Sequence, residues 1–353
     1  MNKVLITFLL ILSLFVSCNL YANNSTVRNV YAGTIGPDSN NEDGSTYYSS
    51  LGTTQWTRSA HPNPLFGSLT GFAISSQETY AITEPGLEAD SGRIYLSTDR
   101  GMTWDNGVSI GVRGIFSIAL DQNYIYVGLG NYQGTVCVKA NDHTNNWNTK
   151  TCQTLPTSSI SALTLSADDK TIYAGTQNDF VCKKANDGAK TPWDEKNCKL
   201  VFFSSNPDTQ ISSLAIDPRT NILYANIVDV SSPSKTNNVI CTSKDEAVTW
   251  SCAALPAEIP DKRVFSNIVV NPANGNVFVG AHSGNICLST NEAKTWACTP
   301  SLDGSPIFSL AVDNSGNYLY AGTLNNIFIS QNAGQDWAFN TTIGEPVGAL
   351  AVE

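Results

Sequence analysis

A polar turn followed by a tryptophan recurs along the whole chain. Its fullest copy, within residues 95–104, contains Ser97, Asp99, Gly101 and Trp104 between two runs of strand-forming residues. The short polar side chains can accept hydrogen bonds from backbone N–H groups inside the turn. Glycine adopts a positive φ without steric cost, and tryptophan offers a large apolar surface to its neighbours. All seven tryptophans of the protein stand in this frame, at positions 56, 104, 147, 193, 250, 296 and 337, which restricts the chain to an array of similar β units.

The other copies keep the frame to different degrees. One keeps both the serine and the glycine, two place alanine at the glycine position, and two lack the serine. Ser49 before Trp56 is a weak seventh copy. We interpret the matched residues as structural; they are Ser330, Asn332, Gly334 and Trp337, then Ser289, Asn291 and Trp296, then Ser243, Asp245 and Trp250, then Asp187 and Trp193, and finally Asp142 and Trp147.

The pattern Ser-x-Asp-x-Gly-x-Thr-Trp resembles the Asp-box, or BNR, repeat, and residues 97–104 match it at all five specified positions. Proteins with this repeat include exported photosystem assembly factors of the Ycf-forty-eight type, sortilin-type receptor ectodomains, sialidases and some xyloglucan-degrading enzymes. The resemblance implies a β-propeller whose boxes are structural and whose ligand-binding residues lie elsewhere. It is specific for the fold rather than for an activity.

Two further signatures precede each turn and complete a unit of four short strands. One is a Tyr-Ala-Gly strand, as in residues 171–176, and the other is an apolar inner strand of small residues. A repeated four-strand unit of ~40–50 residues indicates propeller blades. The inner strands are expected at residues 71–75, 116–121, 160–166, 211–217, 265–271, 307–313 and 347–353.

The two ends of the mature chain predict how the ring closes. Residues 29–34 form a second strand without an inner strand before it, and residues 347–353 form an inner strand with nothing after it. We therefore expect the last strand to complete the first blade, which removes an exposed sheet edge. The predicted fold is all-β, with one seven-bladed propeller over residues 23–353; six or eight blades are the alternatives.

The first 22 residues predict export. An apolar run from Val4 to Val16 follows Lys3, which fits the core of a signal peptide and is too short to span a bilayer. Cleavage after Ala22 would release a secreted or periplasmic protein. The alternative is a lipobox at residues 15–18, which would leave a lipid anchor on Cys18. No later segment has the ~18 continuous apolar residues of a transmembrane segment.

Cysteine usage also favours an oxidising compartment. Apart from Cys18, eight cysteines remain, and each of four repeats carries one before the turn and one after its tryptophan. Eight cysteines allow 105 connectivities, but the repeat frame selects one, because cysteines on the two arms of one hairpin can meet across it. We predict disulfides Cys137–Cys152, Cys182–Cys198, Cys241–Cys252 and Cys287–Cys298. A zinc site is disfavoured because no C-x-x-C pair occurs.

Net charge limits the partners. The formal charge is −10, and removal of residues 1–22 takes away only Lys3, which makes it −11. An acidic protein of this kind is a poor ligand for nucleic acid. We expect a monomer that uses no cofactor and no metal, and whose partner is a protein, a peptide or a glycan.

Candidate ligand-binding residues lie on long loops of one propeller face. Residues 35–46 and 83–92 belong to adjacent blades and together predict an acidic rim, and residues 226–237 form a third long loop. Arg58 lies in an inter-blade loop, and two further arginines precede inner strands. The candidates are Asp38, Glu42, Asp43, Glu84, Glu88 and Asp90, with Arg58, Arg113 and Arg263.

Catalysis is the less favoured hypothesis. The Arg-Ile-Pro motif of sialidases is absent, and the three histidines, His61, His143 and His282, stand in different blades. We expect no catalytic residue and predict an exported, non-catalytic propeller that binds its partner on the loop-rich face. The alternative is a secreted carbohydrate-active enzyme, either a glycosidase that uses two carboxylates or a sialidase-like enzyme.

Overall fold

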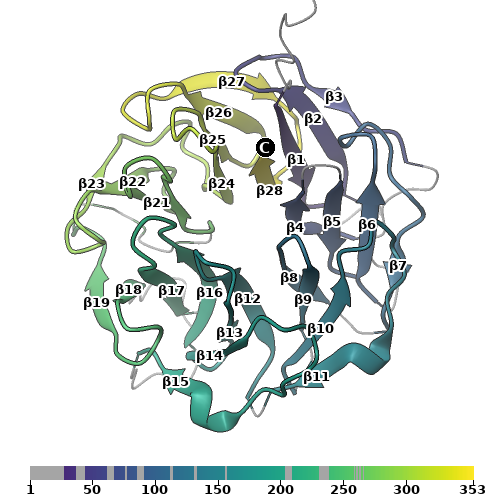
Figure 1. The fold of residues 1–353 in the computed structure, drawn as a ribbon. Helices are drawn as coiled ribbons and strands as arrows, with labels where there is room; N and C mark the ends of the chain where they lie inside the picture. Colours follow the sequence, from purple (N-terminus) through teal and green to yellow (C-terminus); the bar gives the residue numbers. More distant parts are fainter. Residues whose placement is uncertain are drawn as a thin grey trace, which may run out of the picture.

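The chain is a closed ring of small β-sheets. The computed structural model describes residues 28–36, 44–61, 67–75, 78–85, 91–111, 114–130, 133–155, 157–202, 209–229, 238–257, 259, 261, 264 and 266–353. Within these residues, 28 strands form seven sheets of four antiparallel strands each. Figure 1 shows the sheets side by side in a ring, with the first and last strands of the chain in the same sheet. The predicted seven-bladed propeller is confirmed.

We number the blades along the chain and give the strands of each from the centre outward. Blade 1 contains β28 (Val347–Val352), β1 (Asn29–Thr34), β2 (Thr46–Ser50) and β3 (Thr57–Arg58). Blade 2 contains β4 (Leu69–Ile74), β5 (Thr79–Thr83), β6 (Arg93–Ser97) and β7 (Val108–Ser109). Blade 3 contains β8 (Ile115–Leu120), β9 (Tyr124–Leu129), β10 (Thr135–Ala140) and β11 (Cys152–Thr154).

Blade 4 contains β12 (Ile160–Leu165), β13 (Thr171–Thr176), β14 (Phe180–Ala185) and β15 (Cys198–Leu200). Blade 5 contains β16 (Thr209–Ile216), β17 (Leu223–Asp229), β18 (Val239–Ser243) and β19 (Ser251–Ala254). Blade 6 contains β20 (Val269–Val270), β21 (Val277–Gly280), β22 (Ile286–Ser289) and β23 (Ala297–Cys298). Blade 7 contains β24 (Ser309–Val312), β25 (Leu319–Gly322), β26 (Asn326–Ser330) and β27 (Ala338–Thr342).

The C-terminal strand closes the ring as predicted. β28 pairs antiparallel with β1, with Val352 opposite Val30 and Leu350 opposite Ala32. The carboxylate of Glu353, just after β28, accepts a hydrogen bond from the Tyr31 hydroxyl at 2.7 Å and another from the Asn29 N–H at 3.1 Å. The first blade therefore joins two segments from opposite ends of the sequence.

The core lies between neighbouring blades and is built on the second strands. The tyrosine of the repeated Tyr-Ala-Gly pattern is fully buried in six blades, and blade 6 has Phe278 in its place. These second strands are apolar on both faces because a blade packs on each side of them. The buried rings are those of Tyr31, Tyr80, Tyr126, Tyr173, Tyr224, Tyr320 and Phe278.

The recurrent turns pack onto these rings from the next blade. Gly101 of blade 2 has φ +76°, and a Cβ there would lie 2.6 Å from Cε1 of Tyr31 in blade 1. Gly334 of blade 7 has φ +83°, and a Cβ there would lie 2.3 Å from Cε1 of Phe278 in blade 6. Contact with the neighbouring ring therefore requires glycine at both positions, in addition to the positive φ.

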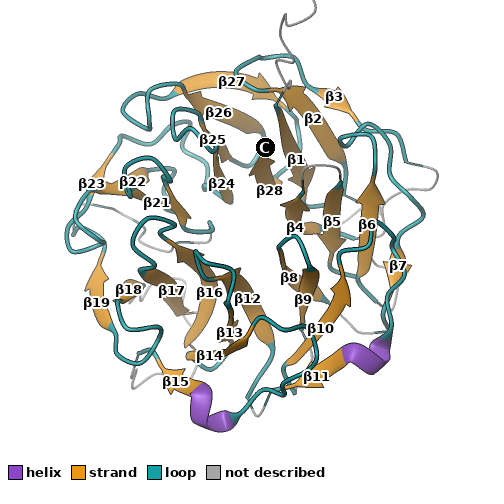
Figure 2. Cartoon of the chain, viewed as in Figure 1, coloured by secondary structure: helices purple, strands orange, loops and turns teal. Residues whose placement is uncertain are grey.

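Two single-turn 3-10 helices lie on the outer edge of the ring, in blades 3 and 4 (Figure 2). They are η1 (Thr149–Thr151) and η2 (Glu195–Asn197), capped by side chains of Asn148 and Asp194. Within the described residues, no helix has the length and apolarity needed to cross a membrane.

Four disulfides join the third strand to the outer strand in blades 3 to 6. Each links two residues that lie directly opposite each other in the ladder, as Cys241 and Cys252 do. The pairs are the predicted ones, with sequence separations of 15, 16, 11 and 11 residues. The two longer separations occur where η1 and η2 precede the second cysteine.

The inner strand of blade 6 is shorter than predicted. The sequence indicates a strand over residues 265–271, but β20 contains only Val269 and Val270. Asn267 instead bonds the next blade: its Nδ2 donates to the Leu310 carbonyl at 2.9 Å and its Oδ1 accepts from the Leu310 N–H at 2.8 Å. The side chain of Ser266 replaces the ladder bonds to β21, because its Oγ accepts from the Gly280 N–H at 2.7 Å and donates to the Gly280 carbonyl at 3.3 Å.

Candidate functional site

The recurrent turns form a common hydrogen-bonded unit in four blades. In blade 2 the Ser97 hydroxyl donates to Asp99 and accepts from the N–H of Gly101, both at 2.8 Å. Asp99 also accepts from the N–H of Thr103 at 2.8 Å. The same bonds recur in the turns that begin at Ser243, Ser289 and Ser330, with asparagine replacing aspartate in the last two.

Alanine adopts the glycine conformation in two of these turns. Ala247 has φ +66° and Ala293 has φ +61°, close to the values of Gly101 and Gly334. A left-handed conformation costs an alanine roughly 1–2 kcal/mol. Both alanines are buried, and Ala247 packs in the same cluster as Tyr173 of the preceding blade, so burial of the methyl group offsets part of this cost.

Buried lysines replace the serine in blades 3 and 4, which sequence reasoning missed. Lys139 and Lys184 immediately precede the alanines that occupy the serine position. Lys184 Nζ donates to the carbonyls of Gly188 at 2.7 Å and Thr191 at 2.6 Å, and lies 3.3 Å from Asp187. Lys139 Nζ similarly binds Asp142 and the Thr144 carbonyl. In the sequence, a lysine stands directly before each alanine that replaces the serine, and this pattern could have indicated the role of the lysines.

All these turns connect a third strand to an outer strand, away from the ring centre (Figure 1). Their polar groups bond the turn itself, and their glycines contact the neighbouring blade. The geometry of these turns therefore supplies blade-to-blade contacts rather than a binding pocket.

Only two of the predicted ligand-binding residues, Glu84 of the acidic rim and Arg58, fall within the described residues. Glu84 follows β5, its N–H donates to the Ser68 carbonyl at 3.0 Å, and burial raises the pKa of its carboxyl. Arg58 ends β3 and donates to the Ser45 hydroxyl at 2.6 Å. The remaining candidates, Asp38, Glu42, Asp43, Glu88, Asp90, Arg113 and Arg263, lie outside the described residues. The acidic rim and its arginines thus remain a prediction.

The three histidines occupy three separate places. His61 stacks on Trp104 with ring centroids 6.3 Å apart, and its Nε2 lies 2.8 Å from the Thr46 hydroxyl. Burial, and then the nearby Arg58 charge, lower the pKa of His61 to about 4, so its imidazole is neutral at pH 7. His143 pairs with Glu78 between blades 3 and 2.

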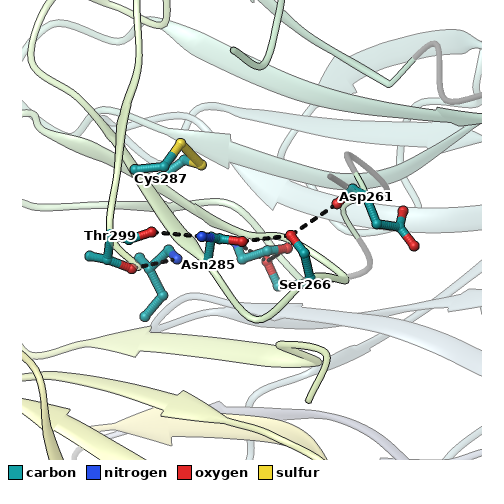
Figure 3. The surroundings of a disulfide bond; sticks show 9 residues. Asp261, Ser266, Asn285, Cys287 and Thr299 are labelled. Carbon is teal, nitrogen blue, oxygen red and sulfur yellow. Dashed lines mark hydrogen bonds between the residues drawn. A yellow bond between two sulfur atoms is a disulfide. The ribbon is translucent and has the colours of Figure 1, made fainter. Parts of the chain in front are cut away.

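His282 contacts Asp261 through Nδ1 at 2.9 Å, in the loops of blade 6. The adjacent Ser283 hydroxyl is bonded to the Asp261 carbonyl at 3.2 Å and to Asn285 Oδ1 at 2.6 Å. Asn285 in turn donates to the Thr299 carbonyl, beside the disulfide of Cys287 (Figure 3). The Ser283 hydroxyl is therefore bonded to a carbonyl oxygen and an amide oxygen. Such bonds hold the loop in place and do not activate a serine as a nucleophile.

A cavity of about 300 Å³ lies at the ring centre and forms a channel lined by residues from all seven blades. Among the described residues, its wall carries hydroxyl and amide side chains, three phenylalanines and aliphatic residues, and no charged side chain. The polar lining residues are Thr70, Ser117, Ser161, Ser212, Ser213, Asn267 and Ser309, and the aromatic ones are Phe72, Phe116 and Phe308.

Side chains of the channel wall join neighbouring blades at six of the seven junctions. Thr70 of blade 2 donates to the Ile115 carbonyl of blade 3 at 2.6 Å, and Ser309 of blade 7 donates to the Val347 carbonyl of blade 1 at 2.8 Å. Ser161 of blade 4 donates likewise to the Ile211 carbonyl of blade 5. We call these contacts and those of Ser117, Ser213 and Asn267 the inter-blade staples. The hydroxyl ring satisfies backbone groups that face the channel.

The chemistry available in the channel is recognition by neutral hydrogen bonds. No Asp, Glu, His, Lys or Arg lines it within the part of the chain that the structure describes. Elsewhere within the described residues, no three His, Cys, Asp or Glu side chains lie close enough together to hold a metal ion. The described part of the channel wall therefore supplies no carboxylate pair, the minimum for common glycosidases.

Comparison with known proteins gives the fold alone. The sequence matches no protein-family model and no curated protein. A candidate 6-phosphogluconolactonase from Bacteroides uniformis has a similar structure, with TM-score 0.69 and 14% identity over 92% of this chain and 99% of that chain. Hydrazine synthase from Kuenenia stuttgartiensis has TM-score 0.63 and 14% identity over 85% of this chain and 95% of that chain. At such identity, the shared feature is the propeller and not the activity.

Proposed function

We propose that this chain is an exported, non-catalytic propeller that binds a protein, a peptide or a glycan on its loop-rich face. The observation that carries the proposal is the composition of the channel wall, whose described residues supply hydroxyls, an amide and phenylalanines and no charged group. Most of the hydroxyls are committed to inter-blade staples. The geometry thus favours a rigid ring that presents loops, which is the general arrangement of binding scaffolds.

The proposal includes membership of the Asp-box propellers. Its support is the shared bonding of four turns, in which one hydroxyl and one carboxylate or amide organise the same backbone groups. It also includes export through a signal peptide at residues 1–22, with a lipid on Cys18 as the alternative. Four disulfides fit an extracellular or periplasmic location. The mass of the mature N-terminus would distinguish cleavage after Ala22 from lipidation.

The alternative function is a secreted glycosidase, and one observation favours it. Burial raises the pKa of Glu84, which is the property of a general acid. Hydrolysis of neutral chromogenic glycosides by the purified protein, abolished by Glu84→Gln, would establish this alternative and reject the non-catalytic proposal.

Binding on the loop face can be tested with a charge-matched pair of variants. The rim variant carries Glu42→Gln, Asp43→Asn, Glu84→Gln and Glu88→Gln. The control removes four acidic side chains on the opposite face and outer edge, with Asp168→Asn, Glu195→Gln, Glu246→Gln and Asp336→Asn. Capture from envelope and culture-fluid extracts would first identify the partner, and calorimetry with that purified partner would then compare the three proteins.

The expected result is weaker binding by the rim variant alone. Each lost charge contact with a partner weakens binding by roughly 0.2–1 kcal/mol where it is exposed, so four changes predict about a tenfold loss or more. Equal affinity of the wild type and the rim variant would reject the acidic rim as the binding surface. An equal loss of affinity in both variants would show that binding depends on the net charge of the protein and not on the rim.

A further inference from the structure

The hydroxyls of the channel wall fall into two sets that differ in the use of their protons. Thr70, Ser161 and Ser309 donate to backbone carbonyls of the next blade. A carbonyl can only accept, so the proton of each hydroxyl is committed to the wall. What these three side chains can offer to the channel is an oxygen lone pair, which makes them acceptors.

Ser117, Ser212 and Ser213 have the opposite polarity. Ser117 Oγ accepts from the Leu163 N–H at 2.6 Å, and Ser213 Oγ accepts from the Ile268 N–H at 3.0 Å. Ser212 Oγ accepts from the side-chain amide of Asn226 at 2.7 Å. N–H groups can only donate, so these three hydroxyls keep their own protons for another acceptor. Blades 3 and 5 therefore place donors on the wall, between the acceptors of blades 2, 4 and 7.

Asn226 is a departure from the repeat that fixes one of these donors. Five other blades have glycine at the equivalent position of the second strand, at residues 33, 128, 175, 280 and 322. Asn226 is fully buried, and its Nδ2 bridges Ser212 Oγ and the Val264 carbonyl. Its Oδ1 is buried and has no hydrogen-bond partner within the described residues. A buried amide with an unsatisfied acceptor is costly and calls for a reason beyond packing.

We propose that the central channel is a second binding site, for a neutral polyhydroxylated molecule of about monosaccharide size. Alternating donors and acceptors match sugar hydroxyls, since each sugar hydroxyl both donates and accepts. The lining residues that the structure describes carry no charge, which disfavours phosphorylated or carboxylated ligands, because burial of such a ligand without a counter-charge is costly. The rings of Phe72, Phe116 and Phe308 give the C–H faces of a sugar apolar contact, and the volume of about 300 Å³ lies at the lower end for ligand sites.

The test uses sugars that differ only in charge. Glucose and N-acetylglucosamine are compared with glucose 6-phosphate and glucuronate by saturation-transfer NMR and calorimetry on the mature protein. The variants are Ser212→Ala, which removes one donor, and Asn226→Gly, which restores the residue of the repeat. Ser251→Ala, on the exposed outer strand β19, is the matched control. Thermal unfolding checks that each variant folds. If Asn226→Gly does not fold, Ser212→Ala alone is sufficient for the test.

A neutral sugar that binds with a Kd near or below about 1 mM, while its charged counterpart does not, is the expected result. Ser212→Ala should weaken this binding roughly 3- to 10-fold, the effect of one neutral hydrogen bond, and Ser251→Ala should leave it unchanged. Three results would overturn the proposal: no neutral sugar binds, charged sugars bind equally, or Ser212→Ala binds as the wild type does. The loop-face function is tested separately, because the rim variant should keep full sugar binding.

Discussion

Two adjacent lysines on β14 allow a direct test of what holds the blade turns. Lys183 and Lys184 point to opposite sides of the strand, since successive strand residues alternate. Lys184 is 6% exposed and binds two turn carbonyls, Gln153 Oε1 and Asp187. Lys183 forms one ion pair, with Glu246 at 3.0 Å. The side chain of Lys183 is 25% exposed and that of Glu246 is 61% exposed.

Replacement of each lysine by methionine keeps an unbranched side chain as far as Cε and removes the ammonium group. In Lys184→Met, the carbonyls of Gly188 and Thr191 lose a donor and Asp187 loses its cation. Loss of one partner from a buried charged network costs roughly 3–5 kcal/mol. Asp187 is 22% exposed and remains partly hydrated, so we expect about 3 kcal/mol of lost unfolding free energy, at the low end of that range. Lys183→Met removes a surface pair and should cost about 0–1 kcal/mol.

Urea unfolding followed by circular dichroism at pH 7 measures both variants against the wild type. The expected order is wild type, then Lys183→Met slightly less stable, then Lys184→Met clearly less stable. Two results would refute the reasoning: equal costs for the two variants, or a cost below about 1 kcal/mol for Lys184→Met, which is within the range of a surface pair. Either result would mean that Lys184 does not replace the missing serine of its turn.

Three further predictions concern the ring, its tyrosines and its disulfides. Ala349 lies opposite Gly33 as Ser117 lies opposite Gly128, so the two positions are equivalent. Ala349→Ser should therefore add an inter-blade staple between blades 1 and 2 and raise the unfolding free energy, measured in urea, by about 0.5–1.5 kcal/mol. No gain in unfolding free energy would contradict this equivalence. Burial raises the pKa of Tyr80, Tyr173 and Tyr320 to about 12 each, so their contribution to stability is complete below about pH 10 and is lost as pH rises toward 12. Tyrosinate absorbance should therefore rise for these residues only together with loss of the circular dichroism signal, and their ionisation in the native fold would refute this. Reduction of the four disulfides should lower the unfolding free energy by roughly 3 kcal/mol for each bond. Hydrogen exchange should then increase in the outer strands of blades 3 to 6. An equal increase in blades 7, 1 and 2 would contradict the idea that each disulfide stabilises its own blade.

The sequence was sufficient for the architecture because each blade repeats the same local constraints. The frame that ends in tryptophan set the blade count, and the unmatched strands at residues 29–34 and 347–353 gave the closure of β1 with β28. The disulfide pairing followed from the same frame, since each cysteine pair lies within one hairpin. Repetition thus converts weak local signals into a specific topology.

The candidate site was less predictable because it depends on contacts between blades. Lys184 reads as an ordinary charged strand residue until its neighbours Gly188 and Thr191 are placed around it. The serines of the inner strands likewise read as small residues suited to packing, whereas the structure makes them hydrogen-bond partners of the next blade. Asn226 was visible as an exception to the glycine pattern, but only its contact with Ser212 gives that exception a role.

The junction of blades 1 and 2 shows how the ring combines a closing strand with a polar channel. Side-chain staples join the inner strands at the six other junctions, but here β28 presents Gly348 and Ala349, which have no polar side chain. This junction is held further out, where Ala60 pairs with Thr103 and the rings of Tyr31 in blade 1 and Phe72 in blade 2 pack with their centroids 6.2 Å apart. A Cβ on Gly348 would lie 2.5 Å from Ile35, so apolar packing of the closing strand excludes a side chain there. The donor and acceptor pattern of the channel is therefore interrupted at blade 1, and a ligand in the channel would find its polar contacts on blades 2 to 7.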